Sequence, residues 1–203
     1  MMINTLGLTM TISKHSTKLK NALFLIMLTF TIATFANEKD LSFPFSKDSG
    51  NYWQYVSDRT MGGVSNGQVT LEQDEGTYFA RLSGNVSTKN NGGFIQLRSG
   101  ISFADTEKNG KALRGVRLKA RGNGERYYIF IRTNENWSYS DYYSASFEAS
   151  QDWQVIDLPF NTFERKQSPS STLYAKNITR FAVVAYGRDF AADVSVADIA
   201  FYY

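Results

Sequence analysis

The chain has 203 residues, of which 22 are basic, 19 are acidic, one is histidine and none is cysteine. The lack of cysteine excludes disulfides, thiol nucleophiles and thiolate metal sites. The single histidine, His15, lies near the N-terminus, so the remainder of the chain has neither a Ser–His–Asp triad nor a histidine-ligated zinc. An enzyme of this sequence would have to use carboxylates, tyrosines or lysines, and we expect no catalytic activity.

Residues 1–36 have the composition of a secretory signal peptide. A positive region without acidic residues precedes an apolar run and small residues at the −3 and −1 positions of a cleavage site: Lys14, Lys18 and Lys20, residues 22–35, and Thr34 and Ala36. The apolar run is too short to span a membrane, and the leader has no arginine, unlike mitochondrial transit peptides. We therefore expect cleavage before Asn37, export to the periplasm or the medium, and no membrane span in the mature protein.

The surplus of basic residues belongs to this leader. Its three lysines, taken from the total of 22 basic residues, leave 19 basic against 19 acidic residues in the remainder. Nucleic acids and anionic membrane surfaces attract proteins with excess positive charge. Neither is therefore expected as a partner of the mature protein.

Short apolar–polar alternations, separated by Gly, Asn, Asp and Pro, predict a series of β-strands. The clearest is 114–121, where Val116, Leu118 and Ala120 face one way and basic residues face the other. The expected strands are 41–50 (an edge strand or N-terminal arm), 53–55, 68–72, 77–83, 94–98, 114–121, 126–132, 142–148, 153–158, 181–186 and 194–202, with a polar connection at 162–176. No segment has the period of an amphipathic helix, so residues 37–203 are predicted to form a single all-β sandwich of jelly-roll or Greek-key type.

Two glycine-containing turns are expected to join strands directly. Residues 74–76 should connect strands 68–72 and 77–83. Gly122 and Gly124 flank Asn123 and are expected to form a hairpin turn before the strand at 126–132. They do not form a dinucleotide-binding fingerprint, because the third glycine is missing and no helix follows.

Two further glycine pairs stand at the centre of the chain. Gly62 and Gly63 lie within residues 58–67, and Gly92 and Gly93 lie within residues 90–98. Glycine pairs occur where the backbone needs a positive φ or approaches another backbone closely. We therefore expect all four glycines to be structurally required corners beside strands.

The same two stretches resemble a known protein family. The pattern is Met-Gly-Gly-Val-Ser from Met61, Asn-Asn-Gly-Gly-Phe from Asn90, and an Arg-Gly-x-Gly turn from Arg121 before a tyrosine strand. It resembles the complex I intermediate-associated proteins, the thirty-kilodalton assembly factors of NADH:ubiquinone oxidoreductase. The similarity covers about residues 41–201. Asn123 departs from it, since the family usually has an acidic residue there.

The resemblance implies a fold and a function. The fold would be galactose-binding-like, similar to certain carbohydrate-binding modules. The function would be that of an assembly factor with a protein partner, by analogy subunits of a respiratory complex. No known catalytic residue set belongs to the family, and we expect no cofactor in this chain. The expected export signal does not fit an assembly factor that works inside mitochondria, so the fold transfers and the specific partner does not.

The corner residues are the first candidate site. If the two corners meet, their side chains would form one polar patch: Asp58, Arg59, Met61, Ser65, Asn90, Asn91 and Arg98. Such a patch would be a recognition surface on rigid loops. The alternative, which we favour, is a buried clasp in which Asp58 or Arg98 holds loop amides.

A loop rich in aromatic residues is the second candidate site. It contains Trp137, Tyr139, Tyr142 and Tyr143. Exposed rings would stack on sugars or anchor a protein partner, whereas buried rings would belong to the core or its rim. At least one ring of the adjacent pair Tyr142 and Tyr143 should face inward, and partial burial is expected for Trp137 and Tyr139.

No metal site can be assigned from the sequence. Glu72, Asp74 and Glu75 lie at a turn, where solvent should keep them ionised, and this disfavours glycosidase chemistry. A structural calcium remains open, without assignable ligands. The sequence therefore predicts a non-catalytic exported module that binds another macromolecule, with a protein undergoing assembly as the leading candidate. The alternative is a carbohydrate-binding module.

Overall fold

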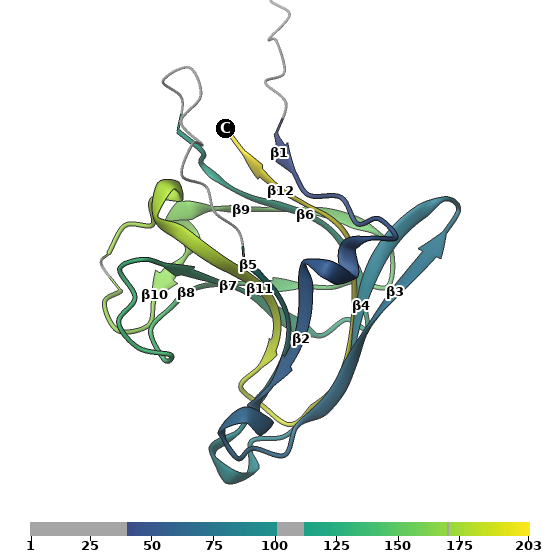
Figure 1. Ribbon diagram of the computed structural model, residues 1–203, viewed down its shortest axis with the longest axis horizontal. Coiled ribbons are helices and arrows are strands. Elements are labelled where there is room, and N and C mark those ends of the chain that lie inside the picture. The colour runs from purple at the N-terminus through teal and green to yellow at the C-terminus, as the bar shows by residue number, and fades with distance from the viewer. Residues whose placement is uncertain (1–39, 101–111, 170) are drawn as a thin grey trace, which may run out of the picture. The chain divides into compact units, whose positions relative to one another are not determined.

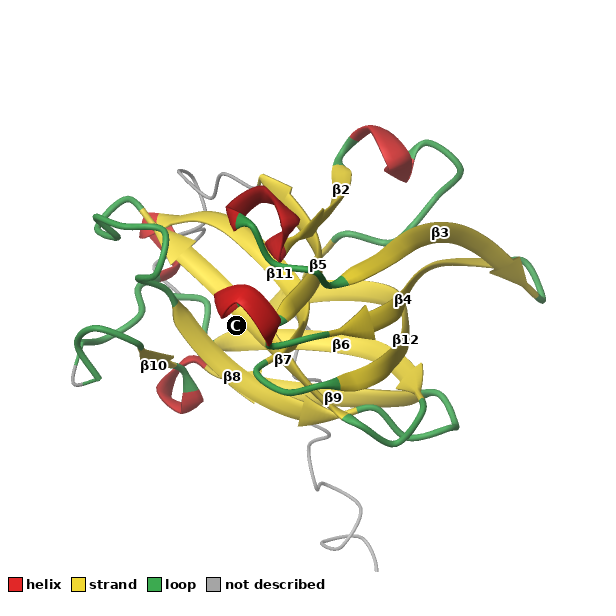
Figure 2. Cartoon of the chain, turned by 90° about the horizontal axis from the view of Figure 1, so that it is seen from below, coloured by secondary structure: helices red, strands yellow, loops and turns green. Residues whose placement is uncertain are grey.

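The computed structural model describes residues 40–100, 112–169 and 171–203. The expected signal peptide and its cleavage site before Asn37 lie outside these residues. The described part consists of two antiparallel β-sheets that enclose one hydrophobic core (Figure 1). Figure 2 shows that the other elements are loops and short turns of helix at the ends of strands.

Sheet A contains β1 (Leu41–Ser42), β3 (Asn66–Asp74), β4 (Thr77–Val86), β6 (Gly115–Gly122), β9 (Gln154–Pro159) and β12 (Phe190–Tyr202). Its order is β3-β4-β12-β6-β9, and β1 pairs with β12. Sheet B contains β2 (Trp53–Ser57), β5 (Phe94–Gly100), β7 (Arg126–Thr133), β8 (Tyr143–Glu148), β10 (Glu164–Arg165) and β11 (Ile178–Tyr186). Its order is β10-β8-β7-β11-β5-β2.

Within the described residues the helical elements are short 3₁₀ turns and none is an α-helix. They are η1 (Ser49–Asn51), η2 (Asp58–Met61), η3 (Lys89–Asn91), η5 (Phe160–Thr162) and η6 (Ala175–Asn177). The predicted all-β jelly-roll sandwich is confirmed. The order of the strands mixes segments that lie far apart in the sequence, as expected for this architecture.

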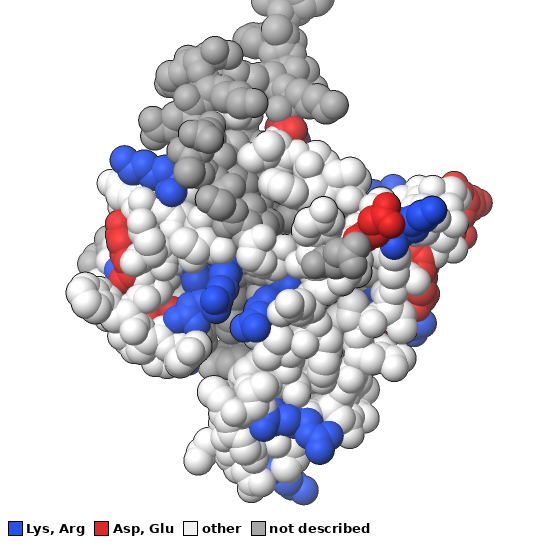
Figure 3. Space-filling model, in the orientation of Figure 1, with Lys and Arg blue, Asp and Glu red and all other residues white. Residues whose placement is uncertain are grey.

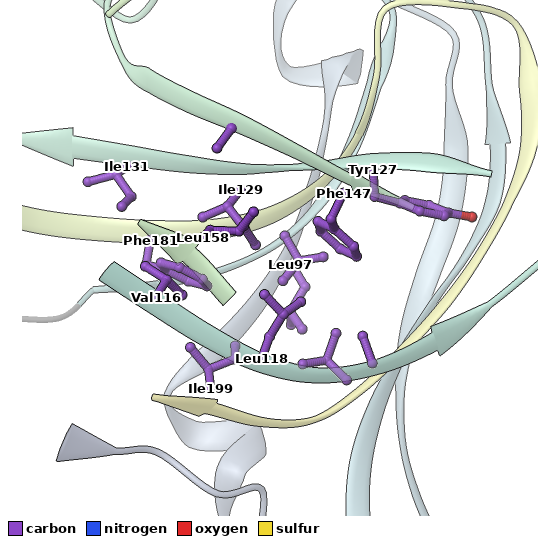
Figure 4. Close-up of a cluster of buried hydrophobic side chains, with 14 of the residues drawn as sticks. Leu97, Val116, Leu118, Tyr127, Ile129, Ile131, Phe147, Leu158, Phe181 and Ile199 are labelled. Atoms are coloured by element: carbon purple, nitrogen blue, oxygen red, sulfur yellow. The ribbon is translucent and has the colours of Figure 1, made fainter. Parts of the chain in front are cut away.

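The core is formed by alternate residues of strands from both sheets. In β6, Val116, Leu118 and Ala120 are buried, as the alternation predicted. In β7, Ile129 and Ile131 contribute the facing surface, so that the two sheets pack through interdigitating side chains (Figure 4). The largest fully buried side chains are Tyr127, Tyr143, Phe181, Phe201, Leu82, Ile95, Leu97, Leu118, Ile129, Ile131 and Ile178.

The predicted pairing of residues 68–72 with 77–83 is confirmed. Strands β3 and β4 form a hairpin in which Asp74 pairs with Thr77, so Glu75 and Gly76 form the two-residue turn. Both turn residues have positive φ, 46° and 81°. This is the conformation that matches the right-handed twist of paired strands.

The expectation of a hairpin at Gly122 and Gly124 is wrong. Strand β6 belongs to sheet A and β7 to sheet B, so this turn carries the chain from one sheet to the other. Gly124 has a positive φ of 82°, and a Cβ at Gly122 would lie 2.7 Å from the Asp193 carbonyl oxygen. The glycines are therefore structural, but local sequence could not distinguish a hairpin from a connection between sheets.

Two segments of the structure differ in detail from the expected strands and loops. Only Leu41 and Ser42 of residues 41–50 form a strand, at the end of β12. The polar connection at 162–176 contains β10, which extends sheet B beside β8. Pro159 lies within β9 at the edge of sheet A, a position where the missing N–H of proline is tolerated.

Candidate functional site

The two glycine corners meet around the buried carboxylate of Asp58. This side chain is fully buried, at 0% exposure. Its Oδ1 accepts the Ser65 N–H at 3.0 Å, and its Oδ2 accepts the Gly93 N–H at 2.6 Å and the Phe94 N–H at 3.2 Å. The Ser65 hydroxyl also donates to Oδ2. The predicted clasp is therefore present, and Asp58 forms it.

Ser65 extends the clasp to the end of β4. Its hydroxyl oxygen accepts the Ser87 N–H at 2.9 Å. A third loop joins through Gly93, whose carbonyl oxygen accepts the Gly187 N–H at 2.8 Å. We refer to residues 58–65 and 88–93 as the clasped corner, which lies at the bottom of Figure 1 where β2 ends.

The charge of Asp58 is stabilised in spite of its burial. Burial alone would raise the pKa of this carboxyl. The hydrogen bonds from the Ser65 hydroxyl and from the amides of Gly93, Phe94 and Ser65 outweigh that effect and lower the pKa. Asp58 is therefore an ionised structural group near neutral pH, and it has no access to a ligand.

The same carboxylate explains two of the four corner glycines. A Cβ at Gly63 would lie 2.4 Å from the Asp58 Cγ, and a Cβ at Gly92 would lie 2.5 Å from Oδ2. Gly62 and Gly93 have positive φ values of 89° and 125°. Two of these glycines thus make room for the carboxylate, and two allow the backbone to turn toward it.

Several corner side chains point outward from this rigid base. Met61 and Val64 are 63% and 44% exposed. Arg59, Asn90 and Asn91 are also exposed, and both asparagines adopt the left-handed conformation. Asp58 and Ser65 lie beneath them, so the predicted patch divides into a buried clasp and an exposed surface.

Arg98 does not belong to the clasped corner. It lies in the middle of β5, four residues beyond Phe94, and within the described residues its guanidinium donates to no loop amide. Its strand neighbours Leu97 and Ser99 are buried, so Arg98 faces away from the core, on the outer face of sheet B. The expectation that it lines the corner patch is wrong, because a strand of this length carries it away from the turn.

The aromatic loop between β7 and β8 exposes its first two rings. Trp137 is 95% and Tyr139 85% exposed, so the expected partial burial is wrong. The loop itself is anchored: Asn136 Oδ1 accepts the Thr133 N–H at 2.6 Å, and the buried Asp141 forms an ion pair with Arg165 at 2.7 Å. Its two exposed rings thus project from a fixed base.

The other two aromatic residues of this loop are buried. Tyr143 points into the core with 0% exposure, and its hydroxyl donates to the Thr172 carbonyl. It is therefore a core residue and cannot contact a ligand from this position. Tyr142 packs on the opposite face of sheet B, where its ring stacks on Phe130 with centroids 4.1 Å apart.

Sequence analysis missed a hollow of about 240 Å³ on this outer face. Lysine, tyrosine and phenylalanine side chains form most of its lining, with a carboxylate at the edge strand: Tyr128, Phe130, Tyr142, Tyr186, Lys166 and Glu164. The signal was present in β7, where Tyr128 and Phe130 place aromatic rings on the face opposite to the core. A strand that faces solvent on one side usually has polar residues there.

Lys166 is fixed between two tyrosines of the hollow. Its ammonium group donates to the Tyr186 hydroxyl at 2.9 Å and to the Tyr142 hydroxyl at 3.2 Å. These hydrogen bonds raise the pKa of Lys166, while burial raises the pKa of Tyr142. The hollow therefore contains a stable cation among aromatic rings.

The described carboxylates with shifted pKa values do not have the shift that a general acid needs. Glu72 and Asp193 both interact with Arg81 on sheet A. Arg81 donates two hydrogen bonds of 2.7 Å to Asp193 and forms an ion pair with Glu72 at 3.8 Å. The pKa of Asp58, Asp141 and Asp157 shifts downward, whereas a general acid needs an upward shift. Within the described residues, no group of three or more Asp, Glu, His or Cys side chains is placed to hold a metal ion.

Residues 42–191 match the family described as complex I intermediate-associated protein 30 (CIA30). The chain belongs to this family. The resemblance carried by the two glycine corners is thereby confirmed, and the CIA30 match includes the whole clasped corner. A search of curated proteins by sequence finds no match.

Solved structures similar to this CIA30 chain include carbohydrate-binding modules. The family 11 module of the cellulosomal cellulase Lic26A-Cel5E of Clostridium thermocellum has a TM-score of 0.61 and 15% identity, over 81% of this chain and 95% of the module. The family 11 module from Clostridium thermocellum in complex with a β-1,3-1,4-mixed-linked tetrasaccharide has a TM-score of 0.60 and 15% sequence identity. This match covers 81% of this chain and 96% of the module. At this identity the likeness shows the fold alone.

No helix in the described residues is long and apolar enough to cross a membrane.

Proposed function

We propose that this chain is an exported, non-catalytic binding module that holds a protein partner during assembly, with the clasped corner as its docking surface. The observation that carries this proposal is the exposure of Met61 and Val64 above the buried carboxylate of Asp58. Apolar side chains on an otherwise rigid loop lose little conformational freedom of the backbone when they bind.

The surroundings of these side chains fit a protein interface. Arg59, Asn90 and Asn91 are exposed beside Met61 and supply charge and amide groups. Protein interfaces combine a few buried anchors with a polar rim, and both arginine and methionine are enriched in them. The clasp keeps both loops in place, so the anchors and the rim would be presented as one surface.

The family supports an assembly role. Its description names an association with intermediates of complex I, and a respiratory-complex subunit is the partner that this analogy favours. The leader at residues 1–36 supports export, and the partner would then be met outside the cytoplasm.

A pull-down from the native envelope fraction tests this proposal. The bait is the mature chain, compared with an Arg59→Ala, Met61→Ser and Asn91→Ala triple variant. Val155→Ser is a matched control, because Val155 is 64% exposed on β9, close to the 63% of Met61. We expect the triple variant to lose a protein that both the wild type and the control retain. Equal capture by all three baits would refute the corner as the docking surface.

The second candidate is carbohydrate binding, which the exposure of Trp137 and Tyr139 favours. Aromatic faces of this kind stack on sugar rings. A glycan array probed with the mature chain and with a Trp137→Ala, Tyr139→Ala double variant tests it. We expect the double variant to keep its melting midpoint, because neither ring packs in the core, and to lose any glycan bound by the wild type. A wild-type chain that binds no glycan removes this candidate.

A further inference from the structure

Three arginines from neighbouring strands face outward together on sheet B. Arg98, Arg132 and Arg180 lie on β5, β7 and β11, which are adjacent in the sheet. Arg180 pairs directly across the strands with Arg132, and Arg98 pairs with Ala182, two residues beyond Arg180. We call these three residues the arginine cluster. Figure 3 shows Lys and Arg side chains gathered at a hollowed part of the surface over β7 and β11.

The cluster lacks the carboxylate partners that six of the other described arginines have. Six arginines form ion pairs with carboxylates of the described residues: Arg81, Arg117, Arg121, Arg126, Arg165 and Arg188. Among the described residues, no carboxylate forms an ion pair with any member of the cluster. Asp141, the acidic group that acts on Arg132 electrostatically, is engaged by Arg165.

This arrangement is unfavourable for the fold itself. Like charges directly opposite each other on a sheet destabilise it. Burial, and then the neighbouring Arg180 and Arg98, lower the pKa of Arg132. Arg132 donates to the Ser138 carbonyl oxygen and lies 5.5 Å from the Tyr139 ring centroid, but no hydrogen bond is formed by the Arg98 or Arg180 guanidinium within the described residues. Contacts among the described residues therefore give a structural role to Arg132 but do not explain Arg98 and Arg180.

We propose that the arginine cluster binds the acidic groups, carboxylate or sulfate, of a polysaccharide laid across the outer face of sheet B. The planar guanidinium offers paired donors that match the two oxygens of such groups. The inference rests on the chain being a binding module, but it does not depend on the clasped corner.

The neighbouring surface suits the uncharged parts of the same polymer. Phe130 is two residues from Arg132 on the same face of β7, and it borders the hollow that contains Tyr142, Tyr186 and Lys166. Lys166 adds a further cation. Glu164 is the carboxylate in the described lining, and it lies on β10 at the edge of the sheet, four strands from Arg98.

A sugar polymer fits this face better than an acidic peptide does. The backbone groups of β5, β7 and β11 are used in pairing with their neighbours in the sheet, so the face offers side chains only. An extended peptide gains main-chain hydrogen bonds at an open sheet edge, and it would find none here. Sugar hydroxyls and ring faces need only donors, acceptors and aromatic rings, and Tyr139 supplies an exposed ring beside Arg132.

Titration calorimetry with matched polymers tests the proposal. The probes are polygalacturonate and dextran sulfate, with uncharged dextran and poly-L-glutamate for comparison. The variants are Arg98→Gln and Arg180→Gln, because Arg132 also holds the aromatic loop. Arg126→Gln is the matched control, since Arg126 lies on β7 and is paired with Glu148. We expect salt-sensitive binding of at least one acidic polysaccharide, weakened about tenfold or more by each cluster variant and little by the control.

Two further measurements separate binding from a structural role. Arg180→Lys keeps the positive charge but loses the paired N–H donors of the planar guanidinium, so this variant should also bind the polysaccharide more weakly. The melting midpoints of the Arg98→Gln and Arg180→Gln variants should stay unchanged or rise, because repulsion between the arginines is relieved.

The proposal is overturned if no acidic polysaccharide binds, if dextran or poly-L-glutamate binds equally well, or if the control variant weakens binding as much as the cluster variants do. In the pull-down, the cluster variants should capture the same protein as the wild type, so the two proposals fail separately.

Discussion

At the scale of single residues, one carboxylate organises the stretches that identify the family. Asp58 accepts hydrogen bonds from both glycine corners, and its carboxylate occupies the space that side chains at Gly63 and Gly92 would fill. A buried charge is tolerated only where hydrogen bonds replace the lost water. In this chain, Gly63, Ser65, Gly92 and Gly93 from the two stretches therefore either donate to this one buried charge or leave room for it.

Replacing Asp58 should destabilise the sandwich strongly. Asp58→Ala leaves the amides of Ser65, Gly93 and Phe94 without their acceptor, which should lower the free energy of unfolding by about 3 kcal/mol or more. Urea unfolding measures this. Asp157→Ala is the control, since its ion pair with Arg117 is exposed and should contribute less than about 1 kcal/mol. Equal losses in both variants would show that the clasp has no special importance.

The lowered pKa of Asp58 also predicts an acid-sensitive contribution to stability. The folded-state pKa lies below the unfolded value of about 3.9, so the contribution is fully present above that value and is lost as the pH falls through the folded pKa. Asp58→Asn removes this titration. The difference in unfolding free energy between wild type and variant should therefore shrink from about pH 7 to about pH 3. A difference that stays constant over this range would contradict the assignment.

Replacing the corner glycines by alanine should lower the free energy of unfolding for two different physical reasons. Gly62→Ala meets no atom within 4 Å but must adopt a φ of 89°, which should cost about 1 kcal/mol. Gly92→Ala collides with the Asp58 carboxylate and should cost about 2 kcal/mol. In an Asp58→Ala background the cost at Gly92 should fall, whereas the cost at Gly62 should remain. Gly50→Ala, with open space and no positive φ, is the control.

At the scale of elements, the β3–β4 hairpin contains an unfavourable turn residue. Glu75 has a positive φ of 46° in a position where asparagine is preferred. Glu75→Asn should raise the melting midpoint, with a gain of about 0.5 kcal/mol, and Gly76→Ala at a φ of 81° should lower stability by about 1 kcal/mol. Thermal unfolding of the two variants shows whether each substitution raises or lowers the melting midpoint. Changes of the same sign would mean that the turn conformation is misassigned.

Strand β7 shows which structural features the alternation of residues in a strand can predict and which it cannot. Its inward residues were predictable, because Ile129 and Ile131 alternate with larger and polar neighbours. The neighbours Tyr128 and Phe130 line a hollow instead of facing open solvent, and this depends on Tyr142 and Lys166, which come from a later loop and from the segment after β10. Only the pairing of β7 with β8 and β11 brings these residues together.

At the scale of the whole molecule, our proposal of export places the binding surfaces outside the cytoplasm. The mature protein should begin near Asn37 and be found outside the cytoplasm, because residues 1–36 carry the features that signal peptidases recognise. N-terminal sequencing and intact mass of the exported protein measure this. Recovery of the full 203-residue chain from the membrane fraction would contradict it.

The sequence by itself determined the all-β class, the core-facing residues of strands such as β6 and the family. It also predicted a clasp at the glycine corners, and the structure decided that Asp58 and not Arg98 forms it. These features depend on local alternation, on turn chemistry and on a family-specific pattern of glycines around one carboxylate. The tertiary structure decided which strands are neighbours. It therefore decided that Gly122 and Gly124 join two sheets, that Arg98 leaves the corner, and that Arg98, Arg132 and Arg180 lie side by side. Contacts of this kind join residues separated by dozens of positions, and no periodicity within one strand specifies its partner.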